Sequence, residues 1–222
     1  MSLPGPGRVP LRALRRATRS RPAADAGERC EMCAEPVEAA HAHVVDLHSR
    51  ALMCSCRPCY LLFTEERASL RYRSVPERYL CFGAGVDDAG WDDLQIPVGL
   101  AFLFRNSVQD RMIAFYPGPA GATESDLPLP AWERIVAAHP GFGVLRADVE
   151  ALLIRRDRPG TTGSCHLVPI DACYALVGQL RGHWRGFGGG PGADQVIEAF
   201  FAGVRARSRP APTATPAKGE TP

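Results

Sequence analysis

The sequence predicts an α+β protein in which a small metal-binding module, similar to a treble clef or zinc ribbon, precedes an antiparallel sheet packed by helices. Two C-x-x-C pairs lie within the first sixty residues, and strand-like and helix-like apolar periodicities follow after residue 70. Apolar residues make up 45% of the 222, which is typical of globular proteins. The expected organisation is an unfolded arginine-rich tail at 1–27, the zinc-binding module at 28–69, the α+β domain at 70–207 and an unfolded Pro-, Ala- and Thr-rich tail at 208–222.

The metal module is expected to contain a cysteine knuckle, a β-hairpin and a short helix. Residues 43–47 and 51–54 predict two short strands, with His48-Ser49-Arg50 as the turn between them. Pro58 suits the first turn of a helix that continues to Thr64. A segment of this size is too short to have a hydrophobic core of its own.

Beyond residue 70, predicted strands and helices follow one another. Strands are expected at 72–75, 98–105, 112–116, 149–155 and 166–169, with a hairpin turn at 106–110 and a glycine-rich turn at 159–163. Helices are expected at 88–95, 129–139, 171–184 and 193–207, with Asp171 as the N-cap of the third. The glycine-rich segment from Gly118 to Ser125 is interpreted as a long surface loop.

Charge and composition limit the classes of function. Residues 1–22 hold six of the 26 basic residues and no acid, which leaves 20 basic and 24 acidic residues and a net charge of about −4 elsewhere. A nucleic-acid binder normally carries its basic stripe on the folded surface, so nucleic acid is not an expected partner. The longest apolar run, 96–104, is too short to span a bilayer, and no signal-like apolar stretch follows Arg15-Arg16. We therefore expect a cytoplasmic protein with reduced cysteines.

The sequences Cys30-Glu-Met-Cys33 and Cys56-Arg-Pro-Cys59 have the spacing of a four-thiolate metal site. Each pair supplies two ligands from one tight turn, and the hairpin within the 22 intervening residues closes the loop. Such a site is closed to water and supplies folding free energy to its module. We predict zinc at these four cysteines, with iron in a rubredoxin-like site as the alternative, because four thiolates bind either metal.

Cys54 and the nearby histidines leave this ligand set open. Cys54 is an alternative ligand to Cys56, but it could also be a small buried residue beside the site or a spare thiol that transfers metal. His41 and His43 would share one face of a strand. Together with His48 they are interpreted as solvent-exposed histidines and not as ligands.

The larger domain has no catalytic signature in its sequence, so no catalytic residue is assigned. The segment from Gly118 to Ser125 lacks the lysine of a Walker loop, but a long loop on a rigid sheet is a candidate docking surface. The candidate partner-binding residues are Tyr116, Glu124, Ser125, Trp184 and Arg185. For Trp184, core packing is the favoured alternative.

Seven short segments form a combined pattern: Cys30-x-x-Cys33, His43-Val-Val-Asp-Leu, Cys54-x-Cys56-x-x-Cys59, Phe115-Tyr-Pro, Gly121-Ala-Thr-Glu-Ser, Leu167-Val-Pro-Ile-Asp and His183-Trp-Arg-Gly. This combination resembles an uncharacterised bacterial family that is typically encoded, in actinobacteria, beside nickel–iron uptake hydrogenases and their maturation proteins. The resemblance covers roughly residues 28–207. The resemblance implies that the four ligand cysteines have the same role in this chain as in the family, and it implies no catalytic residue.

The resemblance implies a cytoplasmic accessory protein whose partner is a hydrogenase subunit or a maturation factor. The leading hypothesis is therefore a non-enzymatic zinc-binding accessory or scaffold protein that supports assembly or maturation of a nickel–iron hydrogenase. The alternative is a redox or metal-handling protein that uses the cysteine cluster to hold iron or transfer metal. A third hypothesis is an enzyme whose cleft the sequence does not reveal.

Overall fold

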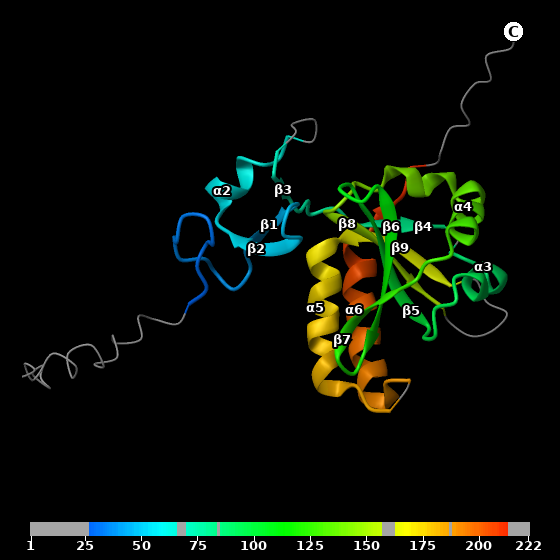
Figure 1. Ribbon diagram of the computed structural model, residues 1–222. Helices are drawn as coiled ribbons and strands as arrows, with labels where there is room; N and C mark the ends of the chain where they lie inside the picture. Colours follow the sequence, from blue (N-terminus) through cyan, green and yellow to red (C-terminus); the bar gives the residue numbers. More distant parts are fainter. Residues whose placement is uncertain (1–26, 66–69, 84, 157–162, 187, 213–222) are drawn as a thin grey trace, which may run out of the picture.

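The computed structural model describes residues 27–65, 70–83, 85–156, 163–186 and 188–212, and two sheets and five α-helices form within them (Figure 1). The strands are β1 (Ala42–Asp46), β2 (Ala51–Ser55), β3 (Tyr72–Ser74), β4 (Leu80–Phe82), β5 (Leu100–Asn106), β6 (Arg111–Gly118), β7 (Gly121–Ser125), β8 (Glu150–Arg155), β9 (Ser164–Pro169) and β10 (Arg209–Pro210). The helices are α2 (Arg57–Leu61), α3 (Asp88–Asp93), α4 (Leu129–Ala138), α5 (Ile170–His183) and α6 (Gly190–Arg207), with a 3₁₀ helix η1 (Pro140–Val144). The α+β class is confirmed.

The expectations for most of the tail at 1–27, for most of the turn at 159–163 and for residues 213–222 lie outside the described ranges. None of the helices in the described part of the chain combines the length and the apolar character that crossing a bilayer requires.

The first sheet has the strand order β2-β1-β3 and is antiparallel throughout. The predicted hairpin forms, and the Asp46 carboxylate closes its turn by accepting the backbone N–H of His48 at 2.9 Å. β3 pairs with the other edge of β1. The sheet therefore extends past residue 69, the predicted end of the metal module.

The second sheet has the strand order β10-β4-β9-β8-β5-β6-β7, and only β10 and β4 are parallel neighbours. β5 and β6 form the expected hairpin. In its turn, the Asn106 side chain accepts the backbone N–H groups of Val108 and Gln109 at 3.0 and 2.9 Å.

The interpretation of Gly118 to Ser125 as a loop is wrong. Residues 121–125 form β7, which pairs with β6 through a tight turn and becomes the edge of the large sheet. Gly121 adopts a φ of +120°, which favours glycine and allows the chain to reverse there. A glycine-rich composition thus reflects the turn and not a long flexible connection.

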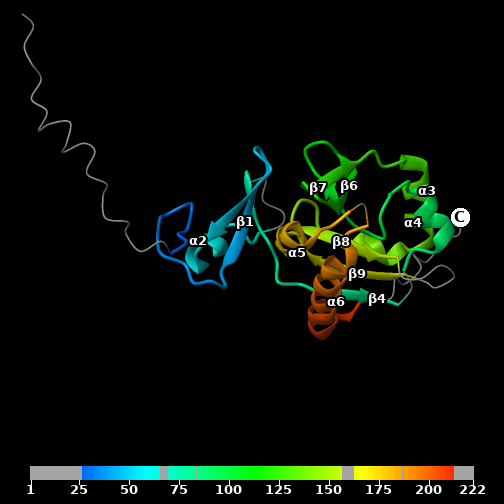
Figure 2. The ribbon, with the colours of Figure 1, turned by 90° about the horizontal axis from the view of Figure 1, so that it is seen from below.

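Helices cover both faces of the large sheet (Figures 1 and 2). Consecutive residues of a strand point to opposite faces, so Phe102 packs into the core beneath α5 and α6 while Leu103 packs into the core beneath α3 and α4. Both residues are at most 2% exposed. Burial on both sides explains why the central strands are nearly continuous apolar runs.

Two predicted boundaries differ from the structure. The N-cap position of α5 is Pro169, and Asp171 lies inside the first turn with a carboxylate oxygen that accepts the backbone N–H of Ala172. The chain after α6 continues as β10, where the sequence analysis expected an unfolded tail from residue 208. The backbone N–H of Arg209 donates to Tyr79 and that of Ala211 to Cys81, so the last described residues add an edge to the sheet.

The small sheet lies beside α5 in both views and is joined to the larger domain through apolar and polar contacts (Figures 1 and 2). Val45 and Val75 are buried in the same core as the residues of α5. The Arg73 guanidinium lies 2.9 Å from the Asp148 carboxylate, and His43 Nδ1 lies 2.8 Å from Asp171 Oδ2. The metal module is therefore packed onto the domain and not merely tethered to it.

Candidate metal centre

The first cysteine pair lies on a tight turn. The backbone N–H of Ala34 donates to the Cys30 carbonyl and that of Cys30 donates to the Glu35 carbonyl, each at 2.8 Å. Ala34 has a φ of +63°, a left-handed conformation in which glycine is common. This turn directs the Cys30 and Cys33 side chains to the same side of the backbone.

The second pair lies at the beginning of α2. Cys56 occupies the N-cap position, Pro58 follows in the first turn as expected, and the Tyr60 N–H donates to the Cys56 carbonyl at 2.9 Å. Cys59 lies in the same short helix, so both thiols of this pair project from its first turn. No residue of α2 is buried, and its Cys59 thiol, with that of Cys56 at the N-cap, meets the thiols of the knuckle.

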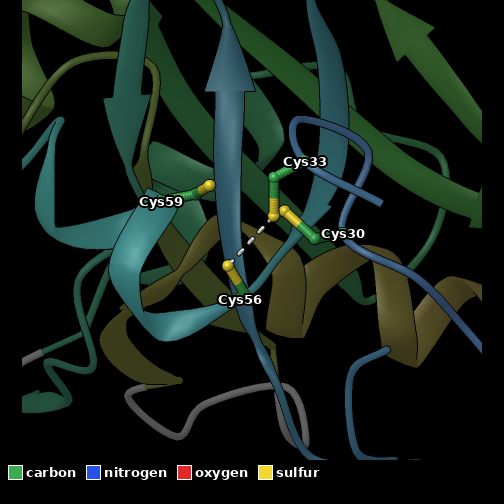
Figure 3. A group of neighbouring side chains, drawn as sticks. All are labelled: Cys30, Cys33, Cys56 and Cys59. Atoms are coloured by element: carbon green, nitrogen blue, oxygen red, sulfur yellow. Dashed lines mark hydrogen bonds between the residues drawn. The ribbon is translucent and has the colours of Figure 1, made fainter. Parts of the chain in front are cut away.

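The four predicted ligands converge (Figure 3). The sulfur atoms of Cys30, Cys33, Cys56 and Cys59 all lie within 4.8 Å of one another, and those of Cys33 and Cys56 are 3.6 Å apart. Four sulfurs placed 2.3 Å from a central ion at tetrahedral angles would be about 3.8 Å apart. The cluster therefore needs only small movements to become a tetrahedral metal site.

The protonation chemistry of the cluster also fits a cation. Burial raises the pKa of the Cys30 thiol, but backbone N–H groups of Cys56, Cys33 and Met32 donate toward its sulfur and lower the pKa to about 6. The thiols of Cys56 and Cys33, together with burial, raise the pKa of Cys59 to about 12. Four thiolates at this spacing repel one another, so a bound cation is needed to stabilise all of them in ionised form.

All eight cysteines are free thiols, and a four-sulfur set accepts zinc or iron. The arrangement can thus bind one metal ion, and its chemical donors do not distinguish these two metals.

Cys54 lies in a different group from the four. Its sulfur is within 4.8 Å of ligand nitrogens of His41 and His43. Its backbone is tied to the knuckle, because its carbonyl accepts the N–H of Glu31 at 2.9 Å and its own N–H donates to the Glu31 carboxylate at 2.6 Å. Cys54 is therefore next to the four-cysteine cluster while facing the histidines.

The interpretation of His41 and His43 as solvent-exposed is wrong. Their side chains are 8% and 23% exposed. His41, just before β1, contacts the Glu38 carbonyl, and His43 lies on β1 with its ring against Asp171 of α5. His48, in the hairpin turn, is exposed as expected.

The candidate partner-binding residues divide into surface and core positions. Glu124 is exposed on β7 and pairs with Arg111 at 3.0 Å, and Ser125 ends the same strand. Arg185 is exposed after α5, whereas Tyr116 is half-buried against the core beneath α3 and α4. Trp184 is 6% exposed and its indole N–H donates to the Gly186 carbonyl, which fits the core-packing role.

Sequence reasoning missed the contribution of Asp171 to the environment of His43. The two residues are 128 positions apart and come from different parts of the fold. The only local signal was an acidic residue at the start of a helix, which predicts a cap equally well.

No curated protein matches this chain, and no solved structure matches it. A family model does match, over residues 29–208, and it is described as a family of unknown function, DUF5947. The matched region contains the knuckle, all five described α-helices and every strand of the two sheets except β10. The chain therefore belongs to the DUF5947 family of unknown function.

Proposed function

We propose that this chain is a non-enzymatic, zinc-binding accessory protein that acts in the cytoplasm and supports assembly or maturation of a nickel–iron hydrogenase. The observation that carries the proposal is the convergence of Cys30, Cys33, Cys56 and Cys59 within 4.8 Å. A four-thiolate set fills every tetrahedral position, which is typical of structural zinc and leaves no position for a substrate.

The size of the module supports a structural role for the metal. α2 has no buried residue, and Leu61 at its end and Leu62 directly after it are 51% and 68% exposed. Two hydrogen bonds between Glu31 and Cys54 join the knuckle to the hairpin. Apolar burial alone is thus small here, and a metal ion would supply the missing folding free energy.

Support for the hydrogenase partner comes from the resemblance described above, two segments of which meet in space. His43 begins one segment, Asp171 ends another, and their side chains form a hydrogen bond of 2.8 Å. A third segment is β7, an exposed edge strand whose backbone groups and Glu124 side chain are available to a protein partner. We place the partner-binding surface on this edge.

A double substitution of Glu124 and Ser125 by alanine tests that placement. It removes an exposed ion pair with Arg111 that contributes about 0–1 kcal/mol, so the protein should remain folded. We expect reduced co-purification of the hydrogenase partner from the native host and lower hydrogenase activity in cells. Glu133→Ala, an exposed acidic residue on α4, is the matched control and should change neither. Equal recovery of the partner with both variants would remove β7 from the proposal.

Metal analysis with an optical spectrum tests the zinc assignment. We expect the four-thiolate site to hold one zinc ion and to be colourless, whereas iron bound by four thiolates absorbs in the visible. A coloured protein with stoichiometric iron would contradict the structural zinc site and favour the redox protein instead.

A metal-handling protein is the second candidate function. It is favoured by one observation, the position of Cys54 beside His41 and His43 and directly next to the four-cysteine cluster. If the chain passes metal to its partner, loaded protein should lose metal to the partner and keep it when incubated alone.

A further inference from the structure

We infer that His41, His43 and Cys54 form a second metal site, which binds a divalent transition ion such as Zn²⁺ through two imidazoles and one thiolate. One ring nitrogen of each histidine and the sulfur of Cys54 lie within 4.8 Å of one another. His43 and Cys54 are direct partners across β1 and β2, and His41 is two residues earlier on the same face. This inference goes beyond the proposed function and does not depend on it.

His41 has one ring nitrogen that is free to bind an ion. Its Nδ1 lies 2.8 Å from the Glu38 carbonyl oxygen, which can only accept, so in the neutral imidazole the proton is on Nδ1 and Nε2 keeps its lone pair. Nε2 is buried and makes no hydrogen bond, and the side chain as a whole is 8% exposed. A buried polar atom without a partner is costly and needs a reason, and an ion beside His41 supplies one.

His43 is oriented in the same sense by a carboxylate. Its Nδ1 lies 2.8 Å from Asp171 Oδ2, so in the neutral imidazole the proton is on Nδ1 and Nε2 is left to bind an ion. The other oxygen of Asp171 accepts the backbone N–H of Ala172 at 2.7 Å, which holds the carboxylate in place. A carboxylate that orients a metal-binding histidine in this way is the usual outer partner of such a ligand.

The donor set defines the class of ion. Two neutral imidazoles and one thiolate are borderline donors, which select zinc, cobalt, nickel or copper over calcium and magnesium. Three protein ligands leave the fourth tetrahedral position open to water or to a donor from outside the protein. In this respect the site differs from the closed four-cysteine cluster.

The site lies at the junction of the metal module with the larger domain. His41, His43 and Cys54 belong to the small sheet and its approach, whereas Asp171 belongs to α5. His43 is 23% exposed, so an ion can enter from solvent. Asp171 acts here as a positioning residue, because it touches His43 and not the ion.

The test is a metal titration of the full-length protein, with zinc measured by elemental analysis and cobalt by absorption. The wild type should bind two equivalents of either metal. In the cobalt titration, the four-thiolate site should give the intense thiolate-to-cobalt charge-transfer band, and the second equivalent should add a weaker increment from a single thiolate. A single equivalent, or a single spectral phase that ends at one cobalt per chain, would overturn the inference.

Variants assign the second equivalent to its residues. His41→Gln, His43→Gln and Cys54→Ser should each bind one equivalent and keep the intense charge-transfer band. His48→Gln and Cys81→Ser, which remove a histidine in the hairpin turn and a thiol in the other sheet, should bind two. Retention of two equivalents in all three ligand variants, or loss of one in His48→Gln, would contradict the assignment.

Asp171→Asn tests the positioning role separately. Loss of an outer carboxylate partner typically weakens metal binding by about 10- to 100-fold, so the second equivalent should bind that much more weakly while the first is unchanged. An equal loss of affinity at both sites would show a general effect on folding and would overturn the positioning role. Failure of the hydrogenase proposal would leave all these metal stoichiometries as they are, so the two can be told apart.

Discussion

Replacing Cys33 with serine separates metal binding from packing, because the Cys33 side chain is exposed. Without zinc, the substitution removes little more than the 3.6 Å approach of its sulfur to that of Cys56. We therefore expect the free energy of unfolding to change by no more than about 0.5 kcal/mol in the presence of a chelator.

With zinc, the expected effect is much larger. Structural zinc in small modules contributes about 10–16 kcal/mol, so one of four thiolates accounts for roughly 2.5–4 kcal/mol, and its loss weakens binding about 100- to 1000-fold. At free zinc 1000 times above the wild-type Kd, the ion stabilises the wild type by about 4 kcal/mol but the variant by only about 0.4–1.4 kcal/mol. The variant should therefore be about 3 kcal/mol less stable than the wild type.

Urea denaturation in zinc-buffered solution and in chelator, followed by circular dichroism, measures both differences. Any other zinc site contributes equally to the two proteins and cancels in the comparison. Cys81→Ser removes a thiol from β4 of the large sheet and should show no zinc-dependent loss. If Cys33→Ser lost as much stability in chelator as in zinc, the cysteine would stabilise the module by packing and the metal assignment would be refuted.

Three further outcomes are expected. The Asp46 carboxylate accepts two hydrogen bonds from Arg71, which hold its pKa well below the ordinary value. Its stabilising effect is therefore complete at neutral pH and is lost as the pH falls below about 4. In urea denaturation, the difference in the free energy of unfolding between wild type and Asp46→Asn should shrink in acid. Arg78 donates two side-chain hydrogen bonds to the fully buried Glu150 carboxylate. Arg78→Met removes both and should lower the free energy of unfolding by about 3–5 kcal/mol. Adding Glu150→Leu to this variant should recover most of the loss. Truncation after residue 208 removes β10 and two backbone hydrogen bonds. It should lower the free energy of unfolding by about 1–3 kcal/mol, measured as a lower Tm. Removal of residues 213–222 alone should leave the Tm unchanged.

Each of these expectations has a contrary result. A difference between wild type and Asp46→Asn that stays constant from pH 7 to pH 2 would show that the carboxylate charge is not what stabilises the turn. A double variant of Arg78 and Glu150 no more stable than the single one would show that shape and not charge matters there. Equal Tm values for the two truncations would show that β10 contributes nothing to the sheet.

Structural features that depend on residues close together in the sequence were predicted well. The β-hairpin of the metal module and the β5–β6 hairpin follow from alternation of apolar residues between turn residues, and both form. The four cysteines predicted as ligands lie within 4.8 Å, because each C-x-x-C pair is placed by its own tight turn. The amphipathic helices α4, α5 and α6 also lie near their predicted ranges.

Edges and partners of the sheets were predicted poorly. β4, β7 and β10 are short strands that were not predicted, and β3 was predicted at 72–75 without its pairing to β1. The assignment of such strands depends on which strand lies beside them and not on their own composition. In β7 the glycine signal was real, but it marked a reversal at Gly121 and not a loop. Short strands gain most of their stability from pairing, which a single segment does not reveal.

By itself, the sequence determined the α+β class, the β1–β2 and β5–β6 hairpins and the four-cysteine cluster, because periodicity and C-x-x-C turns act over a few residues. Only the tertiary structure decided that His41 and His43 face inward, with Cys54 beside them and Asp171 behind His43. The physical reason is that the small sheet buries one face against α5, a helix more than a hundred residues further along the chain. This docking decides which face of β1 is buried, and therefore which histidines lose contact with water and gain a carboxylate partner. The local sequence pattern does not predict it.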